Sequence, residues 1–149
     1  IDLSIHDLDF IQYMLGQPDS VRGVYRKLKN NCDSITSELF YGDTLVTAEG
    51  AWYSYKLPFT CTYSAVFENG TLEYHGGKVY ENGEEVELDA GKVIGDTGIN
   101  ISGVGGYAGE IEYFASCVER GEAPKVVTPD SSLASVRLVE RILENSITL

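Results

Sequence analysis

The chain has 149 residues, 43% hydrophobic and 23% charged, which is the ordinary composition of one globular domain with its own core and excludes a disordered or fibrous protein. Its formal net charge is −12, and the acidic residues are spread along the chain. A field of this sign repels phosphate backbones and anionic lipid headgroups, so we expect no nucleic acid and no membrane among the partners.

A short amphipathic helix is predicted near the start of the chain. Apolar residues recur at helical spacing over residues 5–15, and Gly16 and Pro18 provide a stop signal. Ser4 followed three residues later by Asp7 is the acidic form of a capping box, so we expect the helix to begin at Ser4.

Strands are predicted from about residue 21 to residue 102. Four segments are rich in Val, Thr, Tyr and Phe and alternate imperfectly, namely SVRGVYRKL, DSITSELFY, TLVTAEGAWYSYKL and FTCTYSAVF. Asn69-Gly70 and Asn82-Gly83 each lie between two strand-like segments, which is the strongest short-range signal for a β-hairpin. Consecutive hairpins predict an antiparallel sheet.

Two further helices are predicted over residues 106–120 and 130–145. Their apolar positions are Ile111, Phe114, Ala115 and Val118 in the first, and Leu133, Val136, Leu138, Val139 and Ile142 in the second. The fold class that follows is α+β, with a large, mostly antiparallel sheet and helices packed on one of its faces.

The other face of this sheet is expected to be open for oligomerisation. AWYSY and TCTYSAVF place apolar side chains on both sides of their strands, whereas a solvated face would be polar at every second position. We therefore expect a homodimer or a homotetramer formed through the open sheet face.

The three cysteines, Cys32, Cys61 and Cys117, include no C-x-x-C pair and have no histidine nearby. This spacing argues against a zinc site and a disulfide framework, and it favours reduced thiols, with Cys117 in the core. No apolar run approaches the roughly 20 residues that cross a bilayer, and residue 1 is not followed by a signal-peptide pattern. We expect a cytoplasmic protein with no metal ligands.

Three patterns have ordinary explanations beside a functional one. GVGGYA at residues 103–108 matches a dinucleotide fingerprint, but too little chain follows for a parallel β-α-β unit, so the glycines are interpreted as a strand-to-helix turn. His75 is interpreted as an exposed turn histidine. Trp52, Tyr53 and Tyr55 could line a sugar-like pocket by stacking on C–H faces, and half-buried strand packing explains them equally well.

Asp2 and His6 coincide with the predicted start of the first helix. The positive end of the helix dipole favours a neutral imidazole, whereas a nearby carboxylate favours the charged form. That balance suits a general base that works near neutral pH. The two residues can equally be surface residues without a function, because an Asp near a helix N-terminus stabilises the helix in any case.

The stretch IDLSIHDLDFIQYMLGQPDSV resembles the entry to the C-terminal domain of the Gfo/Idh/MocA family, NAD(P)-dependent oxidoreductases that include glucose-fructose oxidoreductase and inositol dehydrogenase. The family pattern is an Asp, three residues, a His and an acidic, apolar helix ending in L-G-x-P, matched here by Asp2, His6 and residues 15–18. The segment from residue 107 to residue 146 is similar to the two final helices of the family. Ser4 departs from the pattern, since glycine is commoner there.

The resemblance implies that residues 1–149 are the C-terminal substrate-binding and oligomerisation domain of a longer two-domain enzyme. It implies a dehydrogenase acting on a hydroxyl of a sugar, polyol or cyclitol, with His6 as the general base and Asp2 orienting it. NAD or NADP would be bound mainly by an N-terminal Rossmann domain that is absent from this sequence, together with its E-K-P motif. This chain would contribute no cofactor-binding residue and would be inactive alone.

Two other classes of function remain. One is a non-catalytic binding or assembly module, in which Asp2 and His6 are ordinary surface residues. The other is a small independent enzyme that uses the Asp–His pair for hydrolysis, although no metal cluster or activated nucleophile accompanies the pair.

Overall fold

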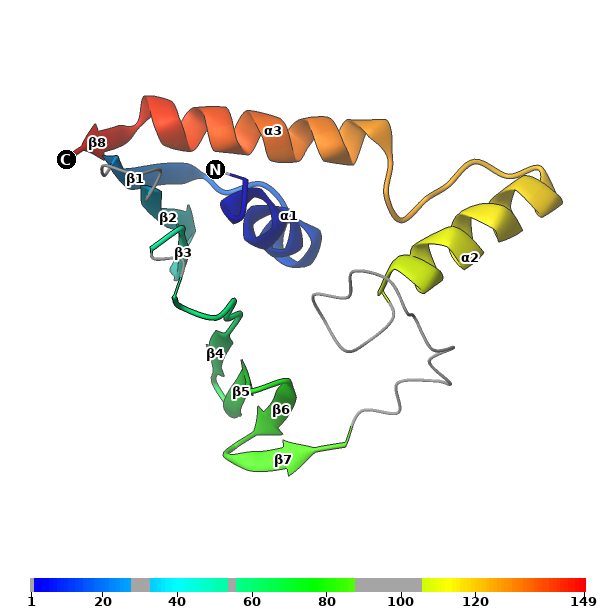
Figure 1. Ribbon diagram of the computed structural model, residues 1–149, viewed down its shortest axis with the longest axis horizontal. Coiled ribbons are helices and arrows are strands. Elements are labelled where there is room, and N and C mark those ends of the chain that lie inside the picture. Colours follow the sequence, from blue (N-terminus) through cyan, green and yellow to red (C-terminus); the bar gives the residue numbers. More distant parts are fainter. Residues whose placement is uncertain (1, 28–32, 54–55, 88–105) are drawn as a thin grey trace. The chain divides into compact units, whose positions relative to one another are not determined.

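The computed structural model describes residues 2–27, 33–53, 56–87 and 106–149 (Figure 1). The chain divides into two units, the first formed by Ile1–Pro58 with Lys125–Leu149 and the second by Phe59–Pro124. Helices and mostly antiparallel strands occur in separate blocks along the chain, so the predicted α+β class is confirmed. The described strands form two sheets of four rather than one large sheet.

The first unit contains two helices and one sheet. Its elements are α1 (Ser4–Leu15), β1 (Ser20–Lys27), β2 (Asp33–Tyr41), β3 (Thr44–Ala51), α3 (Pro129–Glu144) and β8 (Ser146–Thr148). The strand order is β3-β2-β1-β8, where β8 pairs parallel to β1 and the other pairs are antiparallel. The two predicted helices are confirmed to within one residue, whereas β8 was not predicted.

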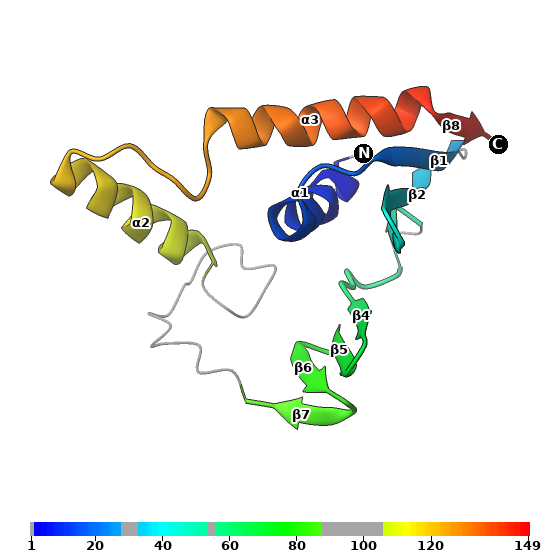
Figure 2. The same ribbon diagram turned by 180° about the vertical axis from the view of Figure 1, so that it is seen from behind.

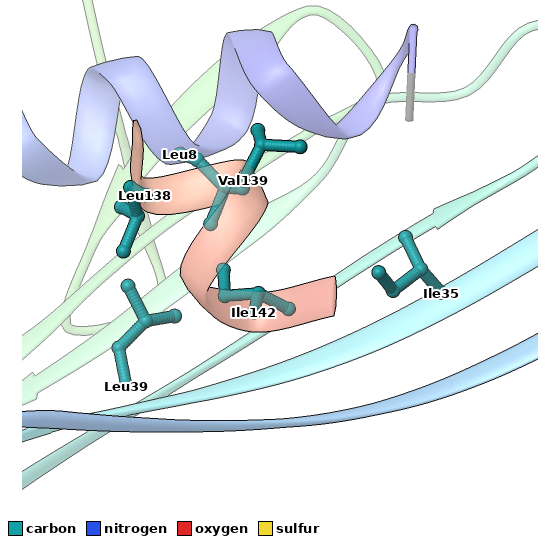
Figure 3. Packing of buried hydrophobic residues seen from close by; sticks show 6 residues of the cluster. All are labelled: Leu8, Ile35, Leu39, Leu138, Val139 and Ile142. Atoms are coloured by element: carbon teal, nitrogen blue, oxygen red, sulfur yellow. The ribbon is translucent and has the colours of Figure 1, made fainter. Parts of the chain in front are cut away.

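Both helices cover the same face of this sheet. Along β2, Ile35, Ser37 and Leu39 are buried, so every second residue faces inward. α1 packs against β3 and α3 packs against β1, and the two helices also pack against each other (Figures 1 and 2). The buried cluster consists of Leu8, Ile35, Leu39, Leu138, Val139 and Ile142 (Figure 3).

Polar contacts fix the helices within this unit. The Ser135 hydroxyl donates to the Asp9 carboxylate and accepts from Gln12 Nε2 at 3.1 Å, which joins α3 to α1. At the start of α3 a capping box is formed by Thr128 and Ser131, each accepting a backbone N–H of the other. This cap was not predicted from the sequence.

Three glycines and one asparagine explain two of the three hairpin turns described in the second unit. Gly76 and Gly77 have φ values of 60° and 79°, and Asn82 and Gly83 have values of 52° and 82°. These left-handed conformations match the twist of two-residue hairpins. The sheet has the order β4-β5-β6-β7, with strands β4 (Tyr63–Phe67), β5 (Gly70–His75), β6 (Lys78–Glu81) and β7 (Glu84–Val86).

The hairpin predicted at Asn82-Gly83 is confirmed, whereas the other predicted turn lies one residue earlier. Phe67 pairs with Gly70, so Glu68 and Asn69 form the turn and Gly70 belongs to β5. A Cβ at Gly70 would overlap the end of the Asn82 side chain, whose Oδ1 accepts from Thr71 N at 2.9 Å, so glycine at this position leaves room for that hydrogen bond.

The third helix, α2 (Gly106–Arg120), has the predicted bounds. Cys117 is buried, as predicted, while Cys61 is exposed. The apolar stripe of α2 is exposed at Ile111, Phe114 and Val118. None of the described helices combines the length and the apolar character needed to span a membrane. Residues 88–105, with Gly103 and Gly105 of GVGGYA, lie outside the described part of the chain, and Gly106 is the first residue of α2.

Candidate functional site

Asp2 and His6 lie at the start of α1, at the surface of the first unit. Asp2 is in a turn before the helix, His6 is in the first helical turn, and both side chains are exposed. The His6 backbone N–H donates to the Leu3 carbonyl at 3.3 Å. Although the structure describes both residues, it contains no hydrogen bond or ion pair between their side chains. His6 is therefore available to an external ligand, and its role stays a prediction.

The expected capping box at this helix start is wrong. The helix begins at Ser4, as predicted, but Leu3 is the N-cap residue, and within the described chain no side chain caps it. Ser4 is only 2% exposed, and its hydroxyl has no hydrogen-bond partner among the described residues. The hydroxyl is directed inward because Ser4 packs on the sheet, so it cannot serve as a cap.

The contact between Ser4 and Gly50 fixes the position of the site. A Cβ on Gly50 would come within 2.9 Å of Ser4 Cβ and 3.1 Å of Ser4 N and Cα. The helix therefore rests directly on β3 at this point, which only glycine permits. At the other end of α1, the Tyr41 hydroxyl donates to the Gly16 carbonyl at 3.2 Å. The start of α1, with Asp2 and His6, thus lies at the end of the sheet where β2 begins and β3 ends.

Asp7 is a third ionisable group at this helix start. Burial raises the pKa of its carboxyl above the ordinary value of 3.8, and the neighbouring His6 charge acts in the opposite direction. The sequence pattern predicted Asp7 only as part of a capping box with Ser4. Its position directly after His6 was the available signal that the two groups interact.

Trp52 and Tyr53 extend the sheet at the same end. The Trp52 backbone N–H donates to the Asp33 carbonyl at 2.8 Å, so the ladder between β2 and β3 continues one residue beyond β3. The Tyr53 hydroxyl donates to the Glu49 carboxylate. Trp52 is 53% exposed and Tyr53 is 51% exposed. Two accessible aromatic rings therefore follow β3, while Tyr55 lies outside the described residues.

Asp33 connects this end of the sheet to the core. Its Oδ2 accepts from the Tyr25 hydroxyl at 3.2 Å, and burial together with this bond raises the pKa of Tyr25. Tyr25 itself packs against the buried cluster. The start of β2, to which Trp52 is hydrogen-bonded, is thus fixed by the backbone ladder and by the Tyr25–Asp33 side-chain bond.

The other candidate residues lie elsewhere. His75 is exposed at the end of β5, as predicted, and its ring stacks on Tyr80 with centroids 4.3 Å apart. Among the described residues, no group of three or more His, Cys, Asp or Glu side chains could hold a metal ion. Asp2 and His6 therefore remain the candidate catalytic groups.

A family model described as an oxidoreductase family, C-terminal alpha/beta domain, matches residues 1–147. Comparisons with curated proteins and with solved structures give no match. The matched range includes α1 with Asp2 and His6, the three described helices and both described sheets except the last residue of β8.

Proposed function

Because the chain belongs to the Gfo/Idh/MocA oxidoreductase family as its C-terminal alpha/beta domain, we propose that it is the substrate-binding and catalytic domain of an NAD(P)-dependent dehydrogenase. The proposed substrate is a sugar, polyol or cyclitol that is oxidised at a hydroxyl group. The observation that supports this best is the exposed imidazole of His6 at a helix start that Ser4 and Gly50 hold on the sheet.

His6 is proposed to act as the general base. Its exposed imidazole can accept the hydroxyl proton of a bound substrate, and an oxygen that has lost this proton expels hydride more readily than an alcohol does. Asp2, exposed one helical turn earlier, would orient the imidazole and stabilise its charged form. The carboxylate of Asp7 adds to the negative charge around His6.

The described residues do not fit a dinucleotide site. Such a site needs a glycine-rich turn between a parallel strand and a helix. Among the described strands the parallel pair is β1 with β8, and β8 is a three-residue strand that follows α3. We propose that NAD or NADP is bound mainly by a separate Rossmann domain. The step assigned to this chain is therefore proton transfer at the substrate hydroxyl.

Replacement of His6 tests this proposal. In the complete enzyme, His6→Ala should lower kcat by about 10²- to 10⁴-fold, the usual contribution of a general base, while the Kd of the cofactor stays nearly the same. The acidic limb of the pH–rate profile should also disappear. His75→Ala is the matched control, because His75 is the other histidine of the chain and stacks on Tyr80 in the second unit. Near-normal turnover of the His6 variant would remove His6 from the mechanism.

We also propose that the domain forms a homodimer or homotetramer through the open face of the first sheet. That face carries an Arg22–Glu38 ion pair of 2.7 Å beside the exposed side chains of Val24, Leu45 and Ile147. A single monomeric species in sedimentation, unchanged on concentrating tenfold, would refute the association.

The alternative function is that of a non-catalytic assembly module. In that case the domain would still associate, and His6→Ala would have no effect on turnover.

A further inference from the structure

A buried serine of α3 is hydrogen-bonded to the helix that carries the candidate base. Ser135 is 3% exposed, and its hydroxyl donates to the Asp9 carboxylate of α1. The Ser131 carbonyl, 3.2 Å away, is a more distant and uncharged acceptor, so the carboxylate is the stronger partner. Ser135 lies 126 positions after Asp9 in the chain, and the bond therefore depends on the packing of α3 against α1.

The bond to Asp9 is the last of three hydrogen bonds in a row. Gln17 Nε2 donates to Gln12 Oε1, and Gln12 Nε2 donates to the Ser135 hydroxyl at 3.1 Å. All three bonds run in the same direction, toward the Asp9 carboxylate, and hydrogen bonds in such a chain polarise and strengthen one another. The carboxylate is therefore held in one orientation, although Asp9 is an exposed residue.

Asp9 and His6 lie on the same side of α1. Residues three positions apart on a helix are neighbours, with Cβ atoms about 5–6 Å apart, and both of these side chains are exposed. Within the described part of the chain, the side chains of Asp2 and Asp7 make no hydrogen bond. Asp9 is therefore the carboxylate near His6 whose position is fixed by a second helix.

We propose that Ser135 is a positioning residue for His6, because it holds the Asp9 carboxylate beside the imidazole. The inference rests on the proposed function, in which His6 takes the substrate hydroxyl proton and becomes charged. A carboxylate that is already oriented stabilises this charge without reorganising during the transfer. A carboxylate without support would first have to be ordered, at a cost in side-chain entropy. Ser135 is buried and acts through Asp9, so its effect should be on kcat.

The test is steady-state kinetics of the complete enzyme with Ser135→Thr and Ser135→Val, using myo-inositol, glucose and sorbitol as probes. Threonine and valine have nearly the same size and shape and differ in the hydroxyl. Ser135→Val should lower kcat about 3- to 10-fold with a smaller change in KM, because a bond to a charged acceptor is lost. Ser135→Thr should keep most of the wild-type kcat. Equal kcat values for the two variants would refute the role of the hydroxyl.

A double-mutant cycle shows whether Ser135 acts through Asp9. In an Asp9→Asn background, the kcat values of Ser135→Thr and Ser135→Val should agree within about twofold, because the charge that the hydroxyl holds is absent. A difference as large as that in the wild-type background would show that the hydroxyl acts by another route, and it would overturn the proposal.

Ser132→Thr and Ser132→Val are the matched controls, since Ser132 is an exposed serine of the same helix. Their kcat values should be equal. If the Ser135 variants behave like the Ser132 variants while His6→Ala loses kcat, the role of Ser135 is refuted and the proposed function stands. If His6→Ala keeps its turnover, the proposed function fails independently of the Ser135 variants.

Discussion

The two units stabilise their sheets in different ways. In the first, Leu8, Leu39, Leu138 and Ile142 are at most 1% exposed between the helices and one sheet face. In the second, no residue of the described strands β4–β7 is buried, and Val66 is 82% exposed. The first sheet therefore depends on side-chain burial, whereas the second depends on its backbone ladder and its turns.

Local contacts substitute for a core in the second sheet. Tyr63 stacks on its cross-strand partner Tyr74 with ring centroids 5.5 Å apart, and an exposed Lys78–Glu85 ion pair of 2.7 Å spans β6 and β7. A stacked aromatic pair across two strands is worth about 0.2–1 kcal/mol, and an exposed ion pair is screened by solvent. Single substitutions should consequently have much larger effects in the first unit than in the second.

The largest difference is expected from truncating one apolar side chain in each unit. Leu39→Ala should lower the free energy of unfolding of the first unit by about 2–5 kcal/mol, because it leaves a cavity under two helices. Val66→Ala should change the second sheet by less than about 0.5 kcal/mol, since its side chain is already in water. Amide hydrogen exchange, read separately for β1–β2 and β4–β5, measures both effects. A loss above about 1 kcal/mol for Val66→Ala would break the distinction between the units.

The same contrast explains how far the fold could be predicted from the sequence. Hydrophobic period and turn residues predicted the helices and the hairpin at Asn82-Gly83, because these signals are local. They could not predict which apolar stripe is covered: Leu138 of α3 is fully buried, whereas Ile111 of α2 is 70% exposed. The parallel strand β8 is only three residues long and is defined by pairing with β1, over 120 residues earlier in the chain.

The candidate site was predicted only in part, because its local pattern can be read from the sequence whereas its long-range contacts cannot. The D-x-x-x-H pattern identified Asp2 and His6, and the structure places both at the surface beside the start of α1. The inward direction of Ser4 was not predictable, because it depends on the close approach to Gly50, 46 positions later.

Replacing one glycine in each unit should lower the free energy of unfolding by less than Leu39→Ala does. The two replacements should also differ in whether a second substitution, at the residue that the new Cβ meets, relieves the cost. Gly50→Ala forces a Cβ to 3.1 Å from Ser4 N and Cα, so the backbone of α1 must move, at a cost of about 1–3 kcal/mol. Gly70→Ala meets only the end of the Asn82 side chain, which can rotate away at the loss of its bond to Thr71, about 0.5–1.5 kcal/mol.

Double-mutant cycles distinguish these two cases. In an Asn82→Gly background, Gly70→Ala should cost nothing further, because the overlapping side chain and its hydrogen bond are already absent. In a Ser4→Gly background, Gly50→Ala should remain destabilising, because the backbone atoms of residue 4 are still in the way. Full rescue of Gly50→Ala by Ser4→Gly would mean that α1 is not held against β3 by its backbone.

The smallest expected effect is a pH dependence that differs between the units. In the first, burial raises the pKa of Asp7, so the folded protein binds this proton more tightly than the unfolded chain does. The associated loss of stability is present at neutral pH and is relieved as the pH falls toward 3.8 and below. Asp7→Asn should therefore stabilise the first unit at pH 7 by a few tenths of a kcal/mol, limited by solvent screening.

That gain should vanish below the ordinary pKa of the carboxyl, where Asp7 is protonated in both states. In the second unit, the bond to Glu85 raises the pKa of Lys78, so its contribution is complete below 10.5 and is lost only at higher pH. The measurement is the stability of wild type and of Asp7→Asn at about pH 3 and pH 7, obtained from amide exchange in β1 and in β6. The two proteins should differ in stability in β1 at pH 7 and should be the same in β6. An Asp7→Asn gain that is the same at both pH values would show that packing, rather than the carboxylate charge, causes it.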